Sequence, residues 1–123
     1  MVKRFLVTRP RHDLMVEYLY DFSIEIIKVV RKSRDIHVTS LDGSKSTRIN
    51  FEKAVQKEIP SLIFLNGHGD KMRVAGHKDE PILDFNNIDL TCGKIIYALS
   101  CDSLEELGEV AVLKGAKAYI GYR

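Results

Sequence analysis

The chain of 123 residues is 45% hydrophobic and 29% charged, a composition typical of one soluble globular domain. Twelve Lys and Arg against eight Asp and Glu give residues 1–61 a charge of +4, whereas residues 62–123 carry −2. This asymmetry is too mild for a nucleic-acid-binding surface, and no apolar stretch approaches the roughly 20 residues of a membrane span. Two cysteines without a disulfide framework indicate a cytoplasmic setting, and we expect neither nucleic acid nor membrane as a partner.

The first two elements predicted are a short strand and a long helix. Residues 5–8 form an apolar run closed by Arg9 and Pro10, which is typical of a buried strand. Residues 12–31 predict an amphipathic helix of about five turns, because apolar residues recur at intervals of three and four. The apolar face expected of this helix consists of Leu14, Tyr18, Leu19, Phe22, Ile26, Val29 and Val30.

A strand, a helix and a second strand are predicted next. Residues 36–41 favour a strand that turns at Asp42 and Gly43. Asn50 is the expected N-cap of a helix over residues 51–58, and Pro60 stops that helix. Residues 61–65 are nearly all apolar, as expected of a parallel strand covered on both faces.

The second half continues the alternation. Residues 73–84 predict a small hairpin outside the sheet, followed by a strand over residues 94–100. A helix over residues 104–114 and a last strand over residues 116–122 complete the order. Such alternation predicts a single α/β domain over residues 1–123, a three-layer α/β/α sandwich with a mostly parallel sheet of about five strands.

Two of the predicted strands end at chemically active side chains. The segment L-I-F-L-N-G-H-G-D stops at His68, and I-I-Y-A-L-S-C-D-S stops at Cys101. In open parallel sheets, functional groups gather at the carboxyl ends of the strands. Because consecutive strands are usually neighbours, we expect the imidazole and the thiol at the same rim.

Glycines beside His68 suit a catalytic loop. Gly67 permits a sharp turn, and Gly69 leaves its backbone N–H open to a ligand, as an oxyanion donor requires. Cys101 precedes a predicted helix, whose N-terminus favours the thiolate form of a cysteine. The N–H of Cys101 is the second expected oxyanion donor.

Simpler interpretations stay open for each residue taken alone. A cysteine that ends an apolar strand is often a small buried hydrophobic residue, and a histidine between glycines is often a polar turn residue. Cys92 has no partner at a ligand spacing. A zinc site from His68, Asp70, His77 and Cys101 lacks any compact ligand pair, so no metal or cofactor is expected.

These segments resemble the caspase-like (clan CD) cysteine peptidases and are most similar to the CHAT domains. The resemblance rests on L-I-F-L-N-G-H-G-D, a hairpin with V-A-G and P-I-L, I-I-Y-A-L-S-C-D-S and E-V-A-V-L-K-G-A-K-A-Y-I-G, from about residue 61 to residue 121. It departs from the family at Leu104, where a glycine often follows the C-[DE]-S triplet.

The resemblance implies a site in which Cys101 is the nucleophile and His68 the general acid/base, without a third member. Gly69 and Cys101 would supply the oxyanion N–H groups. Asp102 matches an acidic position beside the cysteine in this family, and Asp70 and Asp102 are the candidate residues on the substrate side. The expected activity is hydrolysis of peptide bonds in a peptide or protein substrate.

Two further expectations concern the form of the domain. The alternative to a peptidase is a non-catalytic caspase-like interaction or regulatory module, since a fold alone does not establish activity. The resemblance also implies that further C-terminal elements finish the sheet. We therefore expect an incomplete unit whose edge strand is completed by self-association or by a partner.

Overall fold

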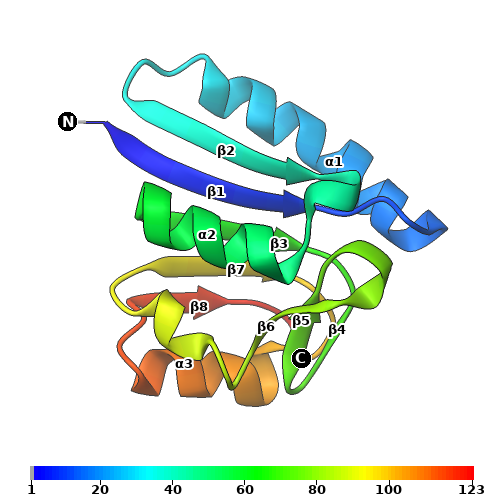
Figure 1. Cartoon of the computed structure of the whole chain (residues 1–123), viewed down its shortest axis with the longest axis vertical. Coiled ribbons are helices and arrows are strands. Elements are labelled where there is room, and N and C mark those ends of the chain that lie inside the picture. The colour runs from blue at the N-terminus through cyan, green and yellow to red at the C-terminus, as the bar shows by residue number, and fades with distance from the viewer. Residues whose placement is uncertain (1) are drawn as a thin grey trace.

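The structure is a computed structural model that describes residues 2–123, and its centre is one parallel β-sheet (Figure 1). The strand order is β2–β1–β3–β7–β8, and all four neighbouring pairs are parallel. The α/β fold with a mostly parallel five-stranded sheet is thus confirmed. The strands are β1 (Lys3–Arg9), β2 (Ile36–Asp42), β3 (Leu62–Asn66), β7 (Ile95–Leu99) and β8 (Ala118–Ile120).

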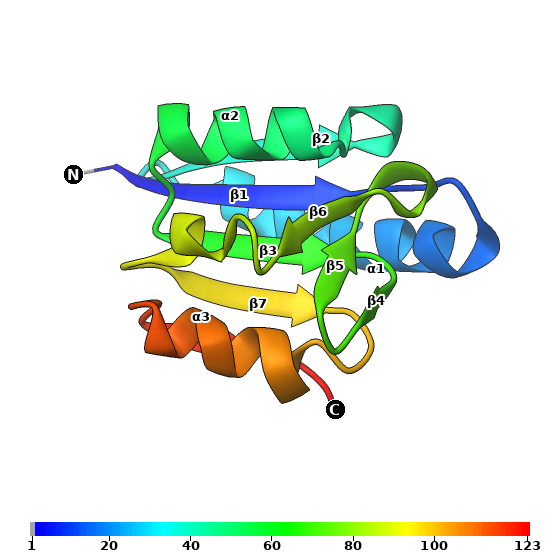
Figure 2. The same cartoon turned by 60° about the horizontal axis from the view of Figure 1, so that its bottom comes forward.

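Helices cover both faces of this sheet. Neighbouring side chains of β1 point to opposite faces of the sheet. Phe5 packs in a cluster with Ile27 of one helix, whereas Leu6 packs in another cluster with Phe51 of a second helix. Figure 2 shows the first helix behind the sheet and the others in front. The helices are α1 (Leu14–Arg31) on one face and α2 (Arg48–Glu58) and α3 (Glu109–Leu113) on the other, with a π-helical turn at Leu104–Gly108 before α3. Within residues 2–123, no helix is long and apolar enough to cross a membrane.

A second, antiparallel sheet of three short strands lies at the carboxyl ends of the parallel strands (Figures 1 and 2). It consists of β4 (Gly69–Asp70), β5 (Arg73–Ala75) and β6 (Pro81–Asp84), with a short 3₁₀ turn at His77–Asp79 between the last two. The predicted hairpin is therefore confirmed, and β4 adds a strand to it that the sequence did not indicate.

The start of α2 differs from the prediction by three residues. Thr47, rather than Asn50, is the N-cap, because the Thr47 hydroxyl accepts a hydrogen bond from the Asn50 N–H at 3.3 Å. The side-chain amide of Asn50 instead donates to the carbonyl of Lys45 at 3.0 Å. Asn50 stabilises the same helix end, but from inside the first turn.

The predicted apolar face of α1 is wrong. The buried positions are Val16, Ser23 and Ile27, whereas most of the predicted face is exposed, with 90% of Leu14 and 57% of Phe22 open to solvent. The helix contacts β1, β2 and β3, and its fully buried positions toward the sheet form the narrow stripe of Val16, Ser23 and Ile27. Apolar residues surround most of α1, so the sequence period alone could not select the buried side.

An ion pair connects α2 to the small sheet and yields the first prediction. Arg48 binds both carboxylate oxygens of Asp84, at 2.7 and 3.0 Å, and the guanidinium holds the pKa of Asp84 below its ordinary value. We expect Asp84→Asn to lower the free energy of unfolding by about 1–2 kcal/mol at pH 7.

Because the pKa of Asp84 is depressed in the folded chain, its stabilisation is present above the ordinary carboxyl pKa. It is lost as the pH falls through the folded value. Urea unfolding should therefore show a deficit for Asp84→Asn at pH 7 that shrinks below about pH 4. The matched control is Asp89→Asn, whose carboxylate is 82% exposed. Equal losses of unfolding free energy in the two variants at pH 7 would refute a stabilising role of the Arg48–Asp84 ion pair.

Candidate functional site

The loops that follow β3 and β7 begin side by side. Asn66 and Leu99, the last residues of the two strands, are paired in the parallel ladder. His68 lies two residues beyond Asn66, and Cys101 lies two residues beyond Leu99. The expectation that the strands are neighbours is confirmed, and the two side chains leave the sheet from equivalent positions.

The two loops also stay in contact after they leave the sheet. The N–H of Gly67 donates to the carbonyl of Leu99 at 3.4 Å. A Cβ atom on Gly69 would overlap Ser100 Oγ and would lie 3.0 Å from the carbonyl oxygen of Arg73. The residue after His68 is therefore packed against the residue before Cys101, so the two loops form one rim.

Gly67 is required by a close approach of backbone. A Cβ atom at this position would overlap the carbonyl oxygen of Ala75 in β5. The N–H of Ala75 in turn donates to the carbonyl of His68 at 2.8 Å. The hairpin thus fixes the main chain on both sides of His68.

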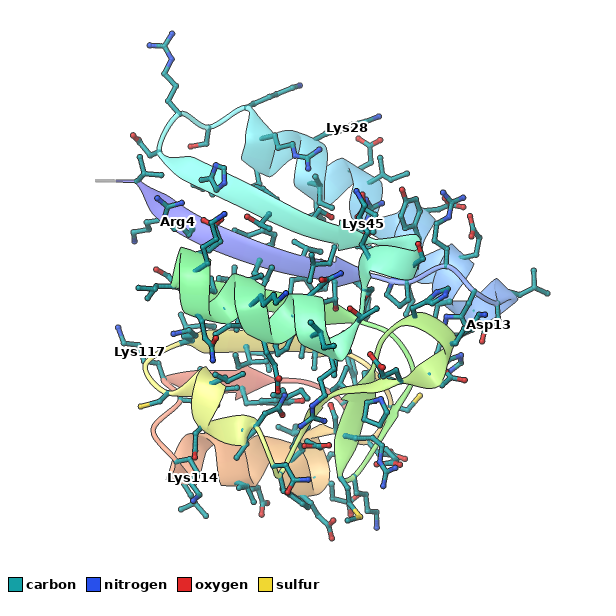
Figure 3. All side chains as sticks on the ribbon, viewed as in Figure 1. Arg4, Asp13, Lys28, Lys45, Lys114 and Lys117 are labelled. Atoms are coloured by element: carbon teal, nitrogen blue, oxygen red, sulfur yellow. The ribbon has the colours of Figure 1, made fainter. Side chains whose placement is uncertain are left out.

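His68 is held by a carboxylate from the first loop of the chain. Its Nε2 lies 2.7 Å from Oδ2 of Asp13, which is also the N-cap of α1 and accepts from the Val16 N–H at 3.0 Å. Figure 3 shows Asp13 at the start of α1, at the same end of the molecule as the small sheet. The Val16 N–H, together with His68, lowers the pKa of Asp13.

This contact determines which nitrogen of His68 is free. An ionised carboxylate only accepts hydrogen bonds, so Nε2 carries the hydrogen and Nδ1 keeps its lone pair in the neutral ring. The sequence alone indicates no third residue for the site. Asp13 could have been noticed as the N-cap directly before α1, although nothing in the sequence indicates a contact with His68, 55 residues away.

Cys101 is exposed, so the interpretation of this residue as a buried hydrophobe is wrong. It lies beside a mainly apolar cleft of about 430 Å³, whose other lining residues are Met15, Leu19, Leu99, Ser100 and Tyr122. Met15 and Leu19 belong to the first two turns of α1, the helix capped by Asp13. The start of α1 therefore contacts both His68 and the surroundings of Cys101.

The N–H groups of the two expected oxyanion donors are not used by the backbone hydrogen bonds of residues 2–123. The hydrogen bond from the Ala75 N–H to the His68 carbonyl makes Gly69 and Val74 a non-hydrogen-bonded pair, so the ladder does not use the Gly69 N–H. Among residues 2–123, the Cys101 N–H donates no hydrogen bond that satisfies standard geometry.

The two acidic residues expected on the substrate side differ in their surroundings. Asp70 accepts a hydrogen bond from the Met72 N–H at 2.8 Å and lies 3.3 Å from Nε of Arg73, so it stabilises its own hairpin turn. Asp102 is exposed directly after Cys101 and has a left-handed backbone with φ of 58°. A substrate contact stays a prediction for both.

Histidines and carboxylates gather at the rim in a set that the sequence did not suggest. In the described part of the chain, the ligand atoms of His12, Asp13, His68 and Asp79 all lie within 4.8 Å of one another. Of the four zinc ligands considered from the sequence, only His68 belongs to this set. The ring of His77 instead packs edge-on against His12, with 5.8 Å between the ring centroids.

One part of the sheet is open and apolar on the α1 side. On β7, Tyr97 stacks on Phe64 of the α1-side cluster. Ile95 and Leu99 lie two residues before and after Tyr97, so their side chains point to the same face of the sheet. Ile120 of β8 is paired with Tyr97 and is 54% exposed. We call these four residues, Ile95, Tyr97, Leu99 and Ile120, the open apolar face.

No protein-family model, curated protein or solved structure matches the chain.

Proposed function

We propose that the chain is a cysteine peptidase domain of the caspase and CHAT type, with Cys101 as nucleophile and His68 as general acid/base. The observation that carries this proposal is the common rim of the two loops. His68 and Cys101 follow paired strand ends, and Gly69 packs against Ser100 between them. Cys101 is also exposed at this rim, so its thiol is open to a substrate.

The proposed reaction follows the chemistry of a thiol nucleophile. The thiolate of Cys101 attacks the carbonyl carbon of a peptide bond, and the carbonyl oxygen becomes an oxyanion that the N–H groups of Gly69 and Cys101 stabilise. The C–N bond then breaks, and His68 protonates the departing amine. Water hydrolyses the resulting thioester, which releases the acid and restores the thiol.

Asp13 has a positioning role in this scheme. It accepts the Nε2–H of His68, so the catalytic proton travels through Nδ1, and the ring cannot turn without losing a 2.7 Å hydrogen bond. The cleft beside Cys101 is lined mainly by apolar side chains of α1 and β7, which favours an apolar substrate residue next to the scissile bond.

The test is a comparison of the two free cysteines within the same protein. Both are exposed, so accessibility alone predicts similar rates of alkylation. We expect iodoacetamide to modify Cys101 faster than Cys92 at neutral pH, because a thiolate reacts and a thiol does not. Peptide mass mapping over time measures both rates, and His68→Ala should slow only Cys101. Equal rates, or a faster Cys92, would refute an activated nucleophile.

The open apolar face favours a second candidate, a module that associates with another copy of itself. Among residues 2–123, β8 pairs only with β7 and is therefore an edge strand, and Ile120 on it is exposed. Residues Met15, Leu19, Phe22 and Ile26 continue the apolar surface along α1 at helical spacing. We propose a second copy as the occupant, since an edge strand can pair with its equivalent around a twofold axis.

Light scattering distinguishes this candidate from a monomeric enzyme. A dimer should form at micromolar concentration and should be disrupted by Ile120→Lys, whereas Lys28→Glu, on the exposed surface of α1, should leave it unchanged. A monomer at all concentrations would refute self-association without affecting the alkylation result.

A further inference from the structure

We propose that His12, Asp13, His68 and Asp79 form a binding site for one divalent transition-metal ion, with Zn²⁺ as the best fit. Two imidazole nitrogens and two carboxylate oxygens are a suitable donor set for this ion. Of the zinc ligands considered in the sequence, this site includes only His68, and it does not depend on peptidase activity.

The spacing of the donor atoms suits tetrahedral coordination. Ligands at about 2.0–2.1 Å from a tetrahedral zinc ion lie about 3.3–3.4 Å from one another. The contacts of His68 Nε2 are 2.7 Å to Asp13 Oδ2 and 3.9 Å to Asp79 Oδ1. Those of His12 Nε2 are 3.6 Å to Asp13 Oδ2 and 3.1 Å to Asp79 Oδ1. These four distances bracket the tetrahedral value, so small side-chain rotations suffice.

The donors come from three separate segments that the fold already holds in place. His12 and Asp13 precede α1, His68 follows β3, and Asp79 lies in the turn between β5 and β6. The turn is fixed by backbone hydrogen bonds from Gly76 to the Glu80 carbonyl at 2.8 Å and from His77 to the Ser46 carbonyl at 2.7 Å. The site is therefore largely preorganised.

The side chain of His12 is nearly buried, and its ring makes polar contacts through one nitrogen, Nε2. Its side chain is only 11% exposed, and its Nδ1 is buried without a hydrogen-bond partner. All polar contacts of the ring are made by Nε2, which lies toward Asp13 and Asp79. Histidine is the commonest metal ligand, and His12 directs its Nε2 at the same two carboxylates that would share the ion.

The charges of the set also favour a divalent cation. With both imidazoles neutral, the two carboxylates give the cluster a charge of −2, which one divalent ion balances. The nearest guanidinium on the same loop, that of Arg11, is bound by both oxygens of Glu17, at 2.6 and 3.1 Å. Arg11 therefore does not neutralise the cluster.

Metal binding and the hydrogen bond of His68 to Asp13 exclude each other. A metal ion needs the lone pair of Nε2, whereas the hydrogen bond to the Asp13 carboxylate needs a hydrogen on that nitrogen. A bound ion would thus tie the first loop, the β3–β4 loop and the hairpin turn together through His68. If His68 serves as the proposed general acid/base, the ion would also take that residue out of the reaction.

The test is titration of the chelator-treated full chain with Zn²⁺ by calorimetry, with Co²⁺ absorption as a probe of coordination geometry. We expect one ion per chain, a tetrahedral Co²⁺ spectrum and a rise in the melting temperature with Zn²⁺. His12→Gln and Asp79→Asn should each weaken Zn²⁺ binding by roughly 10-fold or more. Asp79 is 58% exposed, so its variant should fold normally.

Matched controls separate this site from adventitious binding. His37→Gln, on β2, and Asp70→Asn, beside the site but outside the set, should leave Zn²⁺ affinity unchanged. No saturable binding at one ion per chain would overturn the proposal. So would undiminished affinity in the double variant of His12→Gln and Asp79→Asn. Neither result bears on Cys101, because the alkylation experiment is carried out without metal.

Discussion

Replacement of Cys101 by alanine is expected to abolish peptide hydrolysis while the fold stays intact. The side chain is exposed and ends outside the core clusters, so its removal leaves no cavity. The nucleophile, by contrast, has no substitute in the proposed reaction, and its loss should lower kcat by on the order of 10³-fold or more. A panel of fluorogenic peptides with apolar residues before the scissile bond measures the rate, and thermal unfolding measures the fold.

Cys92→Ala is the matched control, because Cys92 is also a free and exposed cysteine. It should retain the full rate. Hydrolysis that survives in Cys101→Ala, or that disappears in Cys92→Ala, would contradict the assignment of the nucleophile.

Replacement of Gly67 by alanine should disrupt the site and the fold together. The added Cβ would overlap the carbonyl oxygen of Ala75, and that carbonyl belongs to the backbone of β5 rather than to a flexible side chain. Relief requires β5 to move away from His68, although the Ala75 N–H is bonded to the His68 carbonyl at 2.8 Å. We expect a loss of about 2–3 kcal/mol in the free energy of unfolding.

Gly93→Ala separates this clash from an ordinary glycine effect. Gly93 has a φ of 76°, but no neighbouring atom lies within 4 Å of the place that an added Cβ would take, so only backbone strain opposes the change. That strain should cost about 1 kcal/mol and should leave the alkylation rate of Cys101 unchanged. Equal losses of unfolding free energy in Gly67→Ala and Gly93→Ala, measured by urea unfolding, would show that the close approach of β5 does not require a glycine at position 67.

The position of the site along the sheet could be predicted from local sequence. Apolar runs that end at His68 and Cys101 indicated two strand ends, and the rule for functional groups in parallel sheets placed them at one rim. The paired ends of β3 and β7 confirm the neighbouring strands. The contact of Gly69 with Ser100 is a tertiary detail, but it agrees with the same prediction.

The partners of His68 could not be predicted, because they depend on how distant loops meet. Asp13 and Asp79 reach His68 from before α1 and from within the hairpin, and neither has a spacing that marks a ligand. The hairpin turn depends on left-handed backbone at Lys78 and Asp79, with φ of 53° and 62°, which the sequence does not signal with glycine.

The buried side of α1 could not be predicted for a different reason. Apolar residues occur around most of the helix, and periodicity identifies an apolar stripe without saying which stripe meets the sheet. Ser23 is buried because its hydroxyl accepts from the Arg9 guanidinium at 2.8 Å, so a polar residue marks the inner side. That interaction depends on β1 and could not be read from the helix alone.

The most direct test of the central claim is covalent labelling with an electrophilic peptidyl ketone that carries an apolar residue next to the reactive carbon. A peptidyl ketone requires both a nucleophilic thiol and a site that holds the peptide. We predict one adduct per chain, mapped to Cys101, with labelling strongly reduced in His68→Ala and absent in Cys101→Ala. An unmodified Cys101 or an adduct on Cys92 would contradict the account, as would labelling that is indifferent to His68.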